Sequence, residues 1–149
     1  MTQFNSYILL LDCPNLTLKT RARTFEISEG VYAYVGSCGV SCCKRVFRHY
    51  TEKKKMFWHI DYLTVRCRKL GFYLLKTPET EVSNYLAKSL RGVHGFGSSD
   101  DKRVSSHLFR VQEDFNLFLS KLESYVFLKA EKDREALEMC FKATRDPVL

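Results

Sequence analysis

Hydrophobic residues occur in short runs along the first third of the chain, a pattern typical of β-strands. Residues 6–11 (SYILLL) form an apolar run that ends at a turn containing Asp12 and Pro14. Residues 16–27 alternate loosely between apolar and polar side chains, which predicts a partly exposed strand, and residues 31–37 predict another strand. The short connections between these three segments favour a small antiparallel sheet.

The hydrophobic spacing after residue 37 changes to that of an amphipathic helix. Cys43, Val46 and Tyr50 lie three or four residues apart, so they would share one face of this helix. Arg45 and His49 are four residues apart and would share another face. This segment therefore combines an apolar stripe with basic flanks.

The elements of the middle of the chain alternate in type. Residues 57–67 fit either a helix or a strand, and we favour a helix. Residues 71–76 predict a strand, and a proline followed by two glutamates opens a predicted helix over residues 78–90. A loop rich in Gly, Ser and Asp at residues 92–101 and a strand at residues 105–111 follow.

The C-terminal part of the chain has helical composition. Residues 125–128 (YVFL) either interrupt the helices as a strand or join two of them. We therefore expect an α+β fold in which a small, mainly antiparallel sheet is flanked by helices. Residues 1–111 would form the main domain, and residues 112–149 a helical C-terminal extension packed on it.

The charge along the chain separates these two parts. The 149 residues have a net charge of +7, but residues 112–149 contain six Lys/Arg and eight Asp/Glu, so the remainder carries +9. A basic face attracts polyanions, most commonly nucleic acid, although a solvated charged surface has the same composition. The residues expected to bind nucleic acid are Lys44, Arg48, Lys53, Lys54 and Lys55.

No apolar run approaches the roughly 20 residues needed to span a bilayer, and no secretory signal pattern is present. We therefore expect a cytoplasmic protein that does not bind membranes. In such a reducing compartment most of the six cysteines should be free thiols that pack as small apolar side chains. Cys38, Cys42 and Cys43 are closely spaced, which leaves a zinc site as an alternative.

Several side chains have the chemistry needed to cut a phosphodiester bond, which requires charge stabilisation, a base and usually a metal ion. Arg45 offers a guanidinium fork for phosphate oxygens. Tyr7 and Tyr34, if they are neighbours in the sheet, would position or deprotonate the attacking water. Glu81 or Glu79 would hold Mg²⁺ or Mn²⁺ at a helix start. Packing and helix-dipole compensation are the ordinary roles of these residue types.

A second group of polar residues is expected to support this chemistry. Asp61 either faces His59 or orients another partner in a buried polar network. A histidine and aspartates that follow the glycine-rich loop would form a metal or phosphate site. The members of this supporting cluster are His59, Asp61, Ser99, Asp100 and His107.

Five sequence blocks between about residues 5 and 110 carry a family resemblance. These blocks are YVGS, RVFRHY, KKxxxWHIDYL, GFGSSD and SHLF, in this order. They resemble an uncharacterised family of small proteins that is distantly related to the GIY-YIG nucleases. The resemblance implies a GIY-YIG-like fold and a metal-dependent endonuclease or phosphodiesterase that acts on nucleic acid, expected to be DNA, in DNA repair. Some members are fused to a DNA-glycosylase repair enzyme, which suggests such an enzyme as a partner.

The same resemblance assigns roles to individual residues. Tyr34 matches the tyrosine of the YIG motif, and Tyr7 is the counterpart of the GIY tyrosine, although the motif here is SYI. Arg45 matches the helix arginine that contacts the scissile phosphate. The catalytic candidates are Tyr7, Tyr34, Arg45 and His49, and the metal-binding candidate is Glu81, with Glu79 as the alternative.

Two functions from other classes stay open. A non-catalytic nucleic-acid-binding module with the same fold would bind in a salt-dependent manner without cleavage. A partner of a repair enzyme would dock through residues 112–149. The positions of Tyr7, Tyr34, Arg45 and Glu81 discriminate between catalysis and binding alone, because only a catalytic site requires all four to converge on one cleft.

Overall fold

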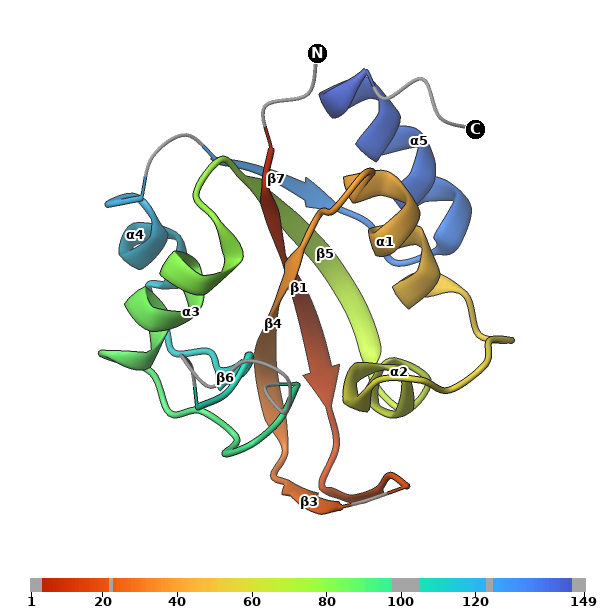
Figure 1. Ribbon diagram of the computed structural model, residues 1–149, viewed down its shortest axis with the longest axis vertical. Coiled ribbons are helices and arrows are strands. Elements are labelled where there is room, and N and C mark those ends of the chain that lie inside the picture. Colours follow the sequence, from red (N-terminus) through yellow and green to blue (C-terminus); the bar gives the residue numbers. More distant parts are fainter. Residues whose placement is uncertain (1–3, 22, 98–104, 123–124, 146–149) are drawn as a thin grey trace.

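The computed structural model describes residues 4–21, 23–97, 105–122 and 125–145. Its centre is a five-stranded sheet with the strand order β6-β4-β1-β5-β7, in which every neighbouring pair is antiparallel (Figure 1). The protein therefore has the α+β fold that the sequence predicts. The strands of this sheet are β1 (Ser6–Cys13), β4 (Gly30–Ser37), β5 (Arg68–Leu75), β6 (Leu108–Arg110) and β7 (Tyr125–Lys129).

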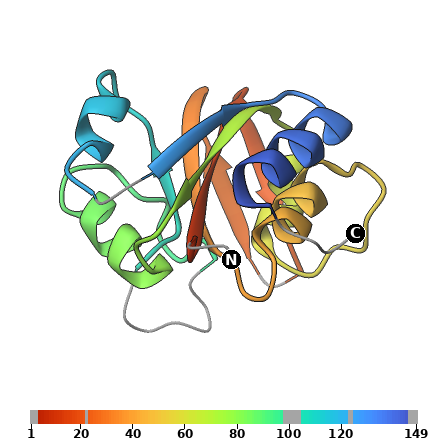
Figure 2. The same cartoon turned by 90° about the horizontal axis from the view of Figure 1, so that it is seen from above.

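Helices cover both faces of this sheet and produce three layers (Figure 2). One face, here called the α1 face, is covered by α1 (Cys42–Tyr50), α2 (His59–Thr64) and α5 (Asp133–Thr144). The opposite face, the α3 face, is covered by α3 (Glu79–Ala87) and α4 (Phe115–Leu119). None of the helices among the described residues is long and apolar enough to cross a bilayer.

Strand β1 shows how one apolar run serves two hydrophobic cores. Tyr7, Leu9 and Leu11 belong to the buried cluster of the α1 face, whereas Ile8 belongs to the cluster of the α3 face. Successive side chains of a strand point to opposite faces, and β1 is the central strand of the sheet. Because both of its faces are covered, the run is almost continuously apolar rather than alternating.

Residues 16–27 form two strands rather than the single predicted strand. Strands β2 (Leu16–Lys19) and β3 (Thr24–Ile27) pair antiparallel as a separate hairpin. The Thr20 amide and hydroxyl both donate to the Arg23 carbonyl, at 2.8 and 3.0 Å, and close the turn. No glycine or proline marks this turn in the sequence, so the pattern of alternation continues through it. The predicted helix at residues 57–67 is present as α2.

The C-terminal part of the chain contributes to the sheet as well as to the helical layers. Strand β7 pairs with β5, so the YVFL segment takes the strand alternative. The Tyr50 hydroxyl donates to the Ala130 carbonyl at 2.7 Å, and a disulfide joins Cys43 of α1 to Cys140 of α5. The C-terminal part of the chain is therefore connected to the sheet by strand pairing and to α1 by the disulfide.

The expectation of free thiols is wrong. The six cysteines, all within described residues, form the disulfides Cys13–Cys67, Cys38–Cys42 and Cys43–Cys140, which leaves no thiolate for a zinc site. All three disulfides lie in the buried cluster of the α1 face. Two of them join residues 54 and 97 positions apart, and only the tertiary fold reveals such a pairing.

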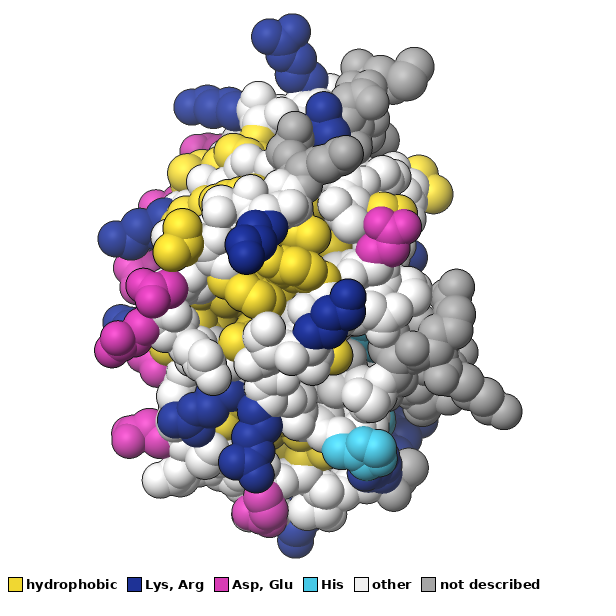
Figure 3. Space-filling model, turned by 90° about the vertical axis from the view of Figure 1, so that its left-hand side faces the viewer, with side chains coloured by type: hydrophobic (Ala, Val, Ile, Leu, Met, Phe, Trp, Pro, Cys, Tyr) yellow, Lys and Arg dark blue, Asp and Glu magenta, His cyan; other side chains and the backbone are white. Residues whose placement is uncertain are grey.

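The α3 face has a partly apolar surface. Hydrophobic side chains are visible on the side of the molecule formed by α3 and α4 (Figure 3). A hollow of about 330 Å³ beside α4 is lined in part by Leu90, Phe115, Leu117 and Phe118. None of the predicted site residues that the structure describes lines this hollow.

Candidate active site

A cleft of about 390 Å³ opens near the end of the sheet where β1 begins and β4 ends. Its walls come from five secondary-structure elements, β1, β4, α1, α2 and α3, and from two residues outside them, Trp58 and Gly97. The lining residues are Tyr7, Tyr34, Gly36, Ser37, Lys44, Arg45, Arg48, His49, Trp58, Ile60, Glu79 and Gly97. All four predicted catalytic residues are among them.

Tyr7 and His49 form a buried hydrogen-bonded pair at the base of the cleft. The Tyr7 hydroxyl lies 2.6 Å from His49 Nε2, and each residue is only 3% exposed. Burial, with help from the nearby Lys54 charge, lowers the pKa of His49 to about 3. Burial and the neighbouring Tyr34 raise the pKa of Tyr7 well above its ordinary value. Both groups are therefore neutral near pH 7, and a proton can pass between them.

The strand register explains how Tyr7 and Tyr34 meet. Tyr7 is paired with Gly36, and a Cβ at that glycine would overlap the Tyr7 ring. Tyr34 lies two residues before Gly36 and so points to the same face, with its ring centroid 6.5 Å from that of Tyr7. Burial and the Glu79 charge raise the pKa of Tyr34. The second phenol therefore also stays protonated.

Lys44 and Arg45 place positive charge at the start of α1. Ser41 caps this nine-residue helix, because its hydroxyl accepts from the Lys44 amide at 3.2 Å. The Arg45 side chain packs against Gly39, where φ is +58° and a Cβ would lie 2.8 Å from Arg45 Nη2. Both basic side chains are exposed, and the helix dipole adds partial positive charge at the same end. This end of the cleft is suited to an anion.

The two candidate glutamates have different positions although both lie in the first turn of α3. Glu79 is partly buried and lines the cleft, whereas Glu81 is exposed and does not line it. Two residues along a helix rotate a side chain by roughly 200°, so only one of the two can face the cleft. The first choice, Glu81, is therefore outside the cleft, and the alternative, Glu79, is inside it.

Asp61 is a fully buried carboxylate that holds Arg48 beside the cleft. Its Oδ2 accepts from Arg48 Nη2 at 2.6 Å and from the amides of Phe57 and Trp58 at 2.9 and 3.0 Å. Burial alone would raise the pKa of Asp61, but these hydrogen bonds outweigh it and lower the pKa. Asp61 therefore orients a partner in a buried polar network, which is the second of its two predicted roles.

His59 belongs to a different environment from its neighbour Asp61. Its Nδ1 accepts from the Gly97 amide at 3.0 Å, and its ring packs against Phe25 and Phe96. Burial lowers the pKa of His59, and the Arg23 charge acts in the same direction. His59 thus anchors the segment that carries Gly97, another residue of the cleft wall.

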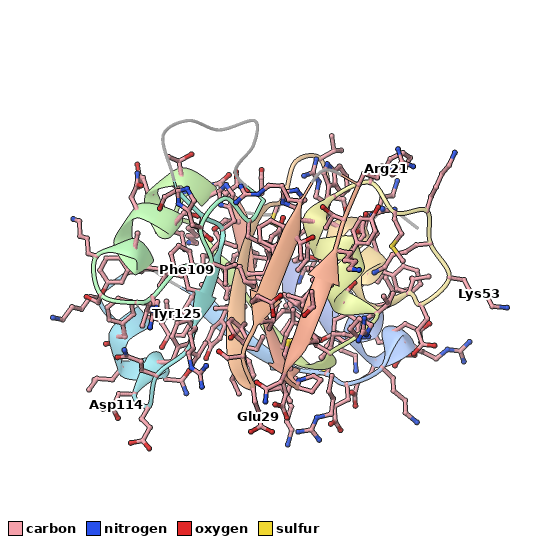
Figure 4. All side chains as sticks on the ribbon, turned by 90° about the horizontal axis from the view of Figure 1, so that it is seen from below. Arg21, Glu29, Lys53, Phe109, Asp114 and Tyr125 are labelled. Carbon is pink, nitrogen blue, oxygen red and sulfur yellow. A yellow bond between two sulfur atoms is a disulfide. The ribbon has the colours of Figure 1, made fainter. Side chains whose placement is uncertain are left out.

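The five predicted nucleic-acid-binding residues separate into two groups. Lys44 and Arg48 line the cleft, and the lysines of residues 53–55 do not. Lys54 Nζ donates to the carbonyls of Arg48 and His49 at the end of α1, and burial lowers its pKa to about 8. Lys53 extends away from the molecule (Figure 4). Lys55 is exposed beside the Phe57 ring.

His107, another member of the predicted polar cluster, does not line the cleft. His107 is buried on the α3 face, where its Nδ1 lies 2.8 Å from the Ser83 hydroxyl. Ser99 and Asp100 lie outside the described residues. The cleft contains Ser37, Trp58 and Ile60 instead, which were not among the predicted site residues. A tryptophan beside a lysine run is the one signal that could have indicated Trp58.

No group of three or more His, Cys, Asp or Glu side chains within the described ranges is placed to hold a metal ion. Glu79 is the carboxylate that lines the cleft, and its charge raises the pKa values of both Tyr7 and Tyr34. A magnesium ion needs only one or two protein carboxylates when water and phosphate oxygens complete its shell. The residues present fit an ion of that kind.

Comparison with known proteins identifies one family. A family model described as "Domain of unknown function DUF123" matches residues 6–128, which include every residue that lines the cleft. No curated protein and no solved structure matches the chain significantly.

Proposed function

The chain belongs to the DUF123 family, and from this premise we propose that it is a metal-dependent endonuclease of the GIY-YIG type. The proposed reaction is hydrolysis of a phosphodiester bond in nucleic acid, expected to be DNA, in DNA repair. One observation carries the proposal: Tyr7, Tyr34, Arg45, His49 and Glu79 converge on a single cleft. These residue types match those that the GIY-YIG resemblance assigns to catalysis.

The basic end of the cleft would bind the scissile phosphate. The Arg45 guanidinium presents parallel N–H donors to two phosphate oxygens, a geometry that a lysine does not offer. Lys44 and the start of α1 add charge on the same side. Since negative charge builds up on these oxygens during attack, donors fixed in place stabilise the transition state more than the ground state.

The Tyr7–His49 pair would remove the proton of the attacking water. The water oxygen bonds to phosphorus, and the bond from phosphorus to the leaving oxygen breaks. At the same time a proton of the water moves to the Tyr7 oxygen, and the Tyr7 proton moves to His49 Nε2. A bound phosphate brings negative charge to the cleft and raises the pKa of His49 from its low value in the empty cleft. Tyr34 would hold the water by a hydrogen bond.

Glu79 is the residue that would hold Mg²⁺ or Mn²⁺ in this cleft. When bound, the ion would neutralise charge on the phosphate and the leaving oxygen. Glu81 is too far around the helix to serve this role, because it is exposed outside the cleft.

The proposal is tested by comparing two basic residues in a cleavage assay on single-stranded and branched DNA with Mg²⁺ or Mn²⁺. Arg45→Ala should lower the cleavage rate by roughly 10²- to 10³-fold, the usual loss when one transition-state donor is removed. Arg66→Ala is the matched control, because Arg66 is also an exposed arginine and does not line the cleft. An Arg45→Ala protein with the wild-type rate would overturn the proposal.

A non-catalytic binding module would use the same basic cleft, and the position of Glu81 outside the cleft favours this module. The catalytic proposal therefore depends on the alternative ligand, Glu79. It predicts salt-dependent binding of nucleic acid and no cleavage with any divalent metal ion. The cleavage assay above therefore separates the two functions when binding is measured on the same samples. Docking of a repair glycosylase through residues 112–149 stays a prediction. Its test needs surface substitutions rather than truncation, because β7 is a strand of the main sheet.

A further inference from the structure

Two adjacent aromatic side chains at the cleft are exposed although large aromatics are usually buried. Phe57 is 63% exposed and Trp58 is 52% exposed, and their ring centroids lie 6.3 Å apart. Trp58 also lines the cleft together with Arg45 and Arg48. An exposed aromatic pair beside a basic cleft is a typical feature of a binding surface.

The pair is held in place by the buried polar network. The Asp61 carboxylate accepts hydrogen bonds from the amides of both aromatic residues and from Arg48. Arg48 Cζ in turn lies 5.1 Å from the Trp58 ring and 5.7 Å from the Phe57 ring, within cation–π distance. Burying a carboxylate is unfavourable unless it is paired and hydrogen-bonded, and three donors reach Asp61 Oδ2. The hydrogen bonds described for Asp61 Oδ2 all go to residues that shape this surface.

These contacts fix the surface before any ligand arrives. The backbone of Phe57 and Trp58 is held by hydrogen bonds at two successive amides, so it loses little conformational entropy on binding. The exposed aromatic pair is therefore preorganised. Asp61 and Arg48 are therefore positioning residues for the aromatic pair. The pair itself provides flat apolar faces next to guanidinium and ammonium groups, the combination on which nucleobases of a single strand stack.

We infer that Phe57 and Trp58 form a stacking platform for an unpaired nucleobase that adjoins the phosphate in the cleft. The inference rests on the proposed function for the identity of that phosphate. Bases inside a duplex are covered on both faces by their neighbours, so they cannot stack on the platform without leaving the helix. The substrate is therefore a single strand, or a branched or damaged duplex with an exposed base.

Trp58 is the only tryptophan in the chain, so fluorescence excited selectively at tryptophan reports on the platform alone. The protein is titrated with four ligands: a short single strand of DNA, the same strand as RNA, the blunt duplex, and the strand made abasic. EDTA is present throughout to prevent cleavage. We expect quenching by both single strands and at least about tenfold weaker binding of the duplex. The abasic strand should bind without quenching. Equal affinity for duplex and single strand would overturn the inference.

A variant that keeps the fluorophore tests the platform independently. Phe57→Ala should weaken single-strand binding by roughly 5- to 100-fold and leave abasic-strand binding unchanged, the range reported by alanine substitution of stacking residues. Phe127→Ala is the matched control, since Phe127 is a 40% exposed aromatic on β7 that does not line the cleft. A stacking role would be contradicted if Phe57→Ala and Phe127→Ala weakened single-strand binding equally. It would also be contradicted if Phe57→Ala weakened abasic-strand binding as much as single-strand binding.

The cleavage assay separates failure of this inference from failure of the proposed function. Arg45-dependent cleavage without a Trp58 response would overturn the platform and leave the nuclease in place. A Trp58 response without cleavage in any divalent metal would support the platform and overturn the nuclease. No response together with no binding would overturn both.

Discussion

Each face of the sheet buries a histidine that is hydrogen-bonded to a hydroxyl group. His49 on the α1 face pairs with Tyr7, His107 on the α3 face pairs with Ser83, and both histidines are 3% exposed. Only His49 lines a cleft, and that cleft also contains Arg45. Burial and a hydrogen bond therefore do not identify a catalytic histidine. The nearby Arg45 charge and the open cleft are what distinguish His49 as the candidate.

The two faces also differ in how their cores are held together. All three disulfides belong to the buried cluster of the α1 face, and the buried cluster of the α3 face contains no cysteine. Cys38–Cys42 spans the turn that leads from β4 into α1, against which the Arg45 side chain packs. The face with the cleft is thus cross-linked by disulfides, whereas the opposite face is held by apolar packing and hydrogen bonds without a disulfide among the residues that the structure describes.

The largest expected effect comes from removing each histidine in turn. His49→Ala should lower the cleavage rate by roughly 10²- to 10⁴-fold, because it removes the proton acceptor of Tyr7. His107→Ala should leave the rate constant unchanged and lower the melting temperature, because it creates a cavity and an unpaired Ser83 hydroxyl. Rates and thermal unfolding are measured on both variants. Equal losses of rate would remove the distinction between the faces.

The cross-linking of the α1 face predicts a large loss of stability. The double variant Cys43→Ser/Cys140→Ser should lower the free energy of unfolding by about 4.7 kcal/mol, because the lost bridge closes a loop of 97 residues. The double variant Cys38→Ser/Cys42→Ser should lose only about 2 kcal/mol, since its sequence separation is 4. Urea denaturation measures both. A larger loss from the short loop would contradict this order.

The two glutamates in the first turn of α3 provide a matched pair of variants that tests the proposed metal site. Glu79→Gln should lower the cleavage rate by roughly 10- to 100-fold at low Mg²⁺, with partial recovery at high Mg²⁺, because it weakens a ligand of the ion. Glu81→Gln makes the same chemical change outside the cleft and should leave the rate unchanged. A response of the rate to Glu81→Gln alone would restore the assignment first made from the sequence.

The smallest effect concerns stability below neutral pH. The pKa of His49 is about 3 in the folded chain and near 6.5 when unfolded, so between these values only the unfolded chain binds the proton. The free energy of unfolding should therefore fall as the pH decreases from about 6.5, by about 2 kcal/mol at pH ~5. Urea titrations at several pH values should show that His49→Gln removes this slope. An unchanged slope would contradict a buried, neutral His49.

Much of the fold could be predicted because the hydrophobic periods of strands and helices are visible in short stretches of the sequence. The apolar run of β1 and the stripe of Cys43, Val46 and Tyr50 on α1 identify their elements without tertiary information. The β2–β3 turn has no local marker, and the pairing of Cys43 with Cys140 depends on how α1 and α5 pack. Features set by contacts between distant segments were those that the sequence could not reveal.

The same division applies to the site. Helix spacing places Arg45 and His49 on one face, but the family resemblance was needed to group them with Tyr7 and Tyr34, because these tyrosines meet only through the pairing of β1 with β4. The choice between Glu79 and Glu81 depends on how α3 is rotated against the sheet, which no local pattern fixes. The partners of Asp61 likewise depend on the path of the chain between α1 and α2.

The most direct test of the cleft as a nucleic-acid site is a crystal structure, without divalent metal ions, with a short single strand that carries a nuclease-resistant phosphorothioate linkage. We predict that one phosphate lies within hydrogen-bond distance of the Arg45 guanidinium and that the adjoining base lies flat on Trp58. A strand bound on the α3 face, or along the lysines of residues 53–55 with the cleft empty, would contradict this assignment.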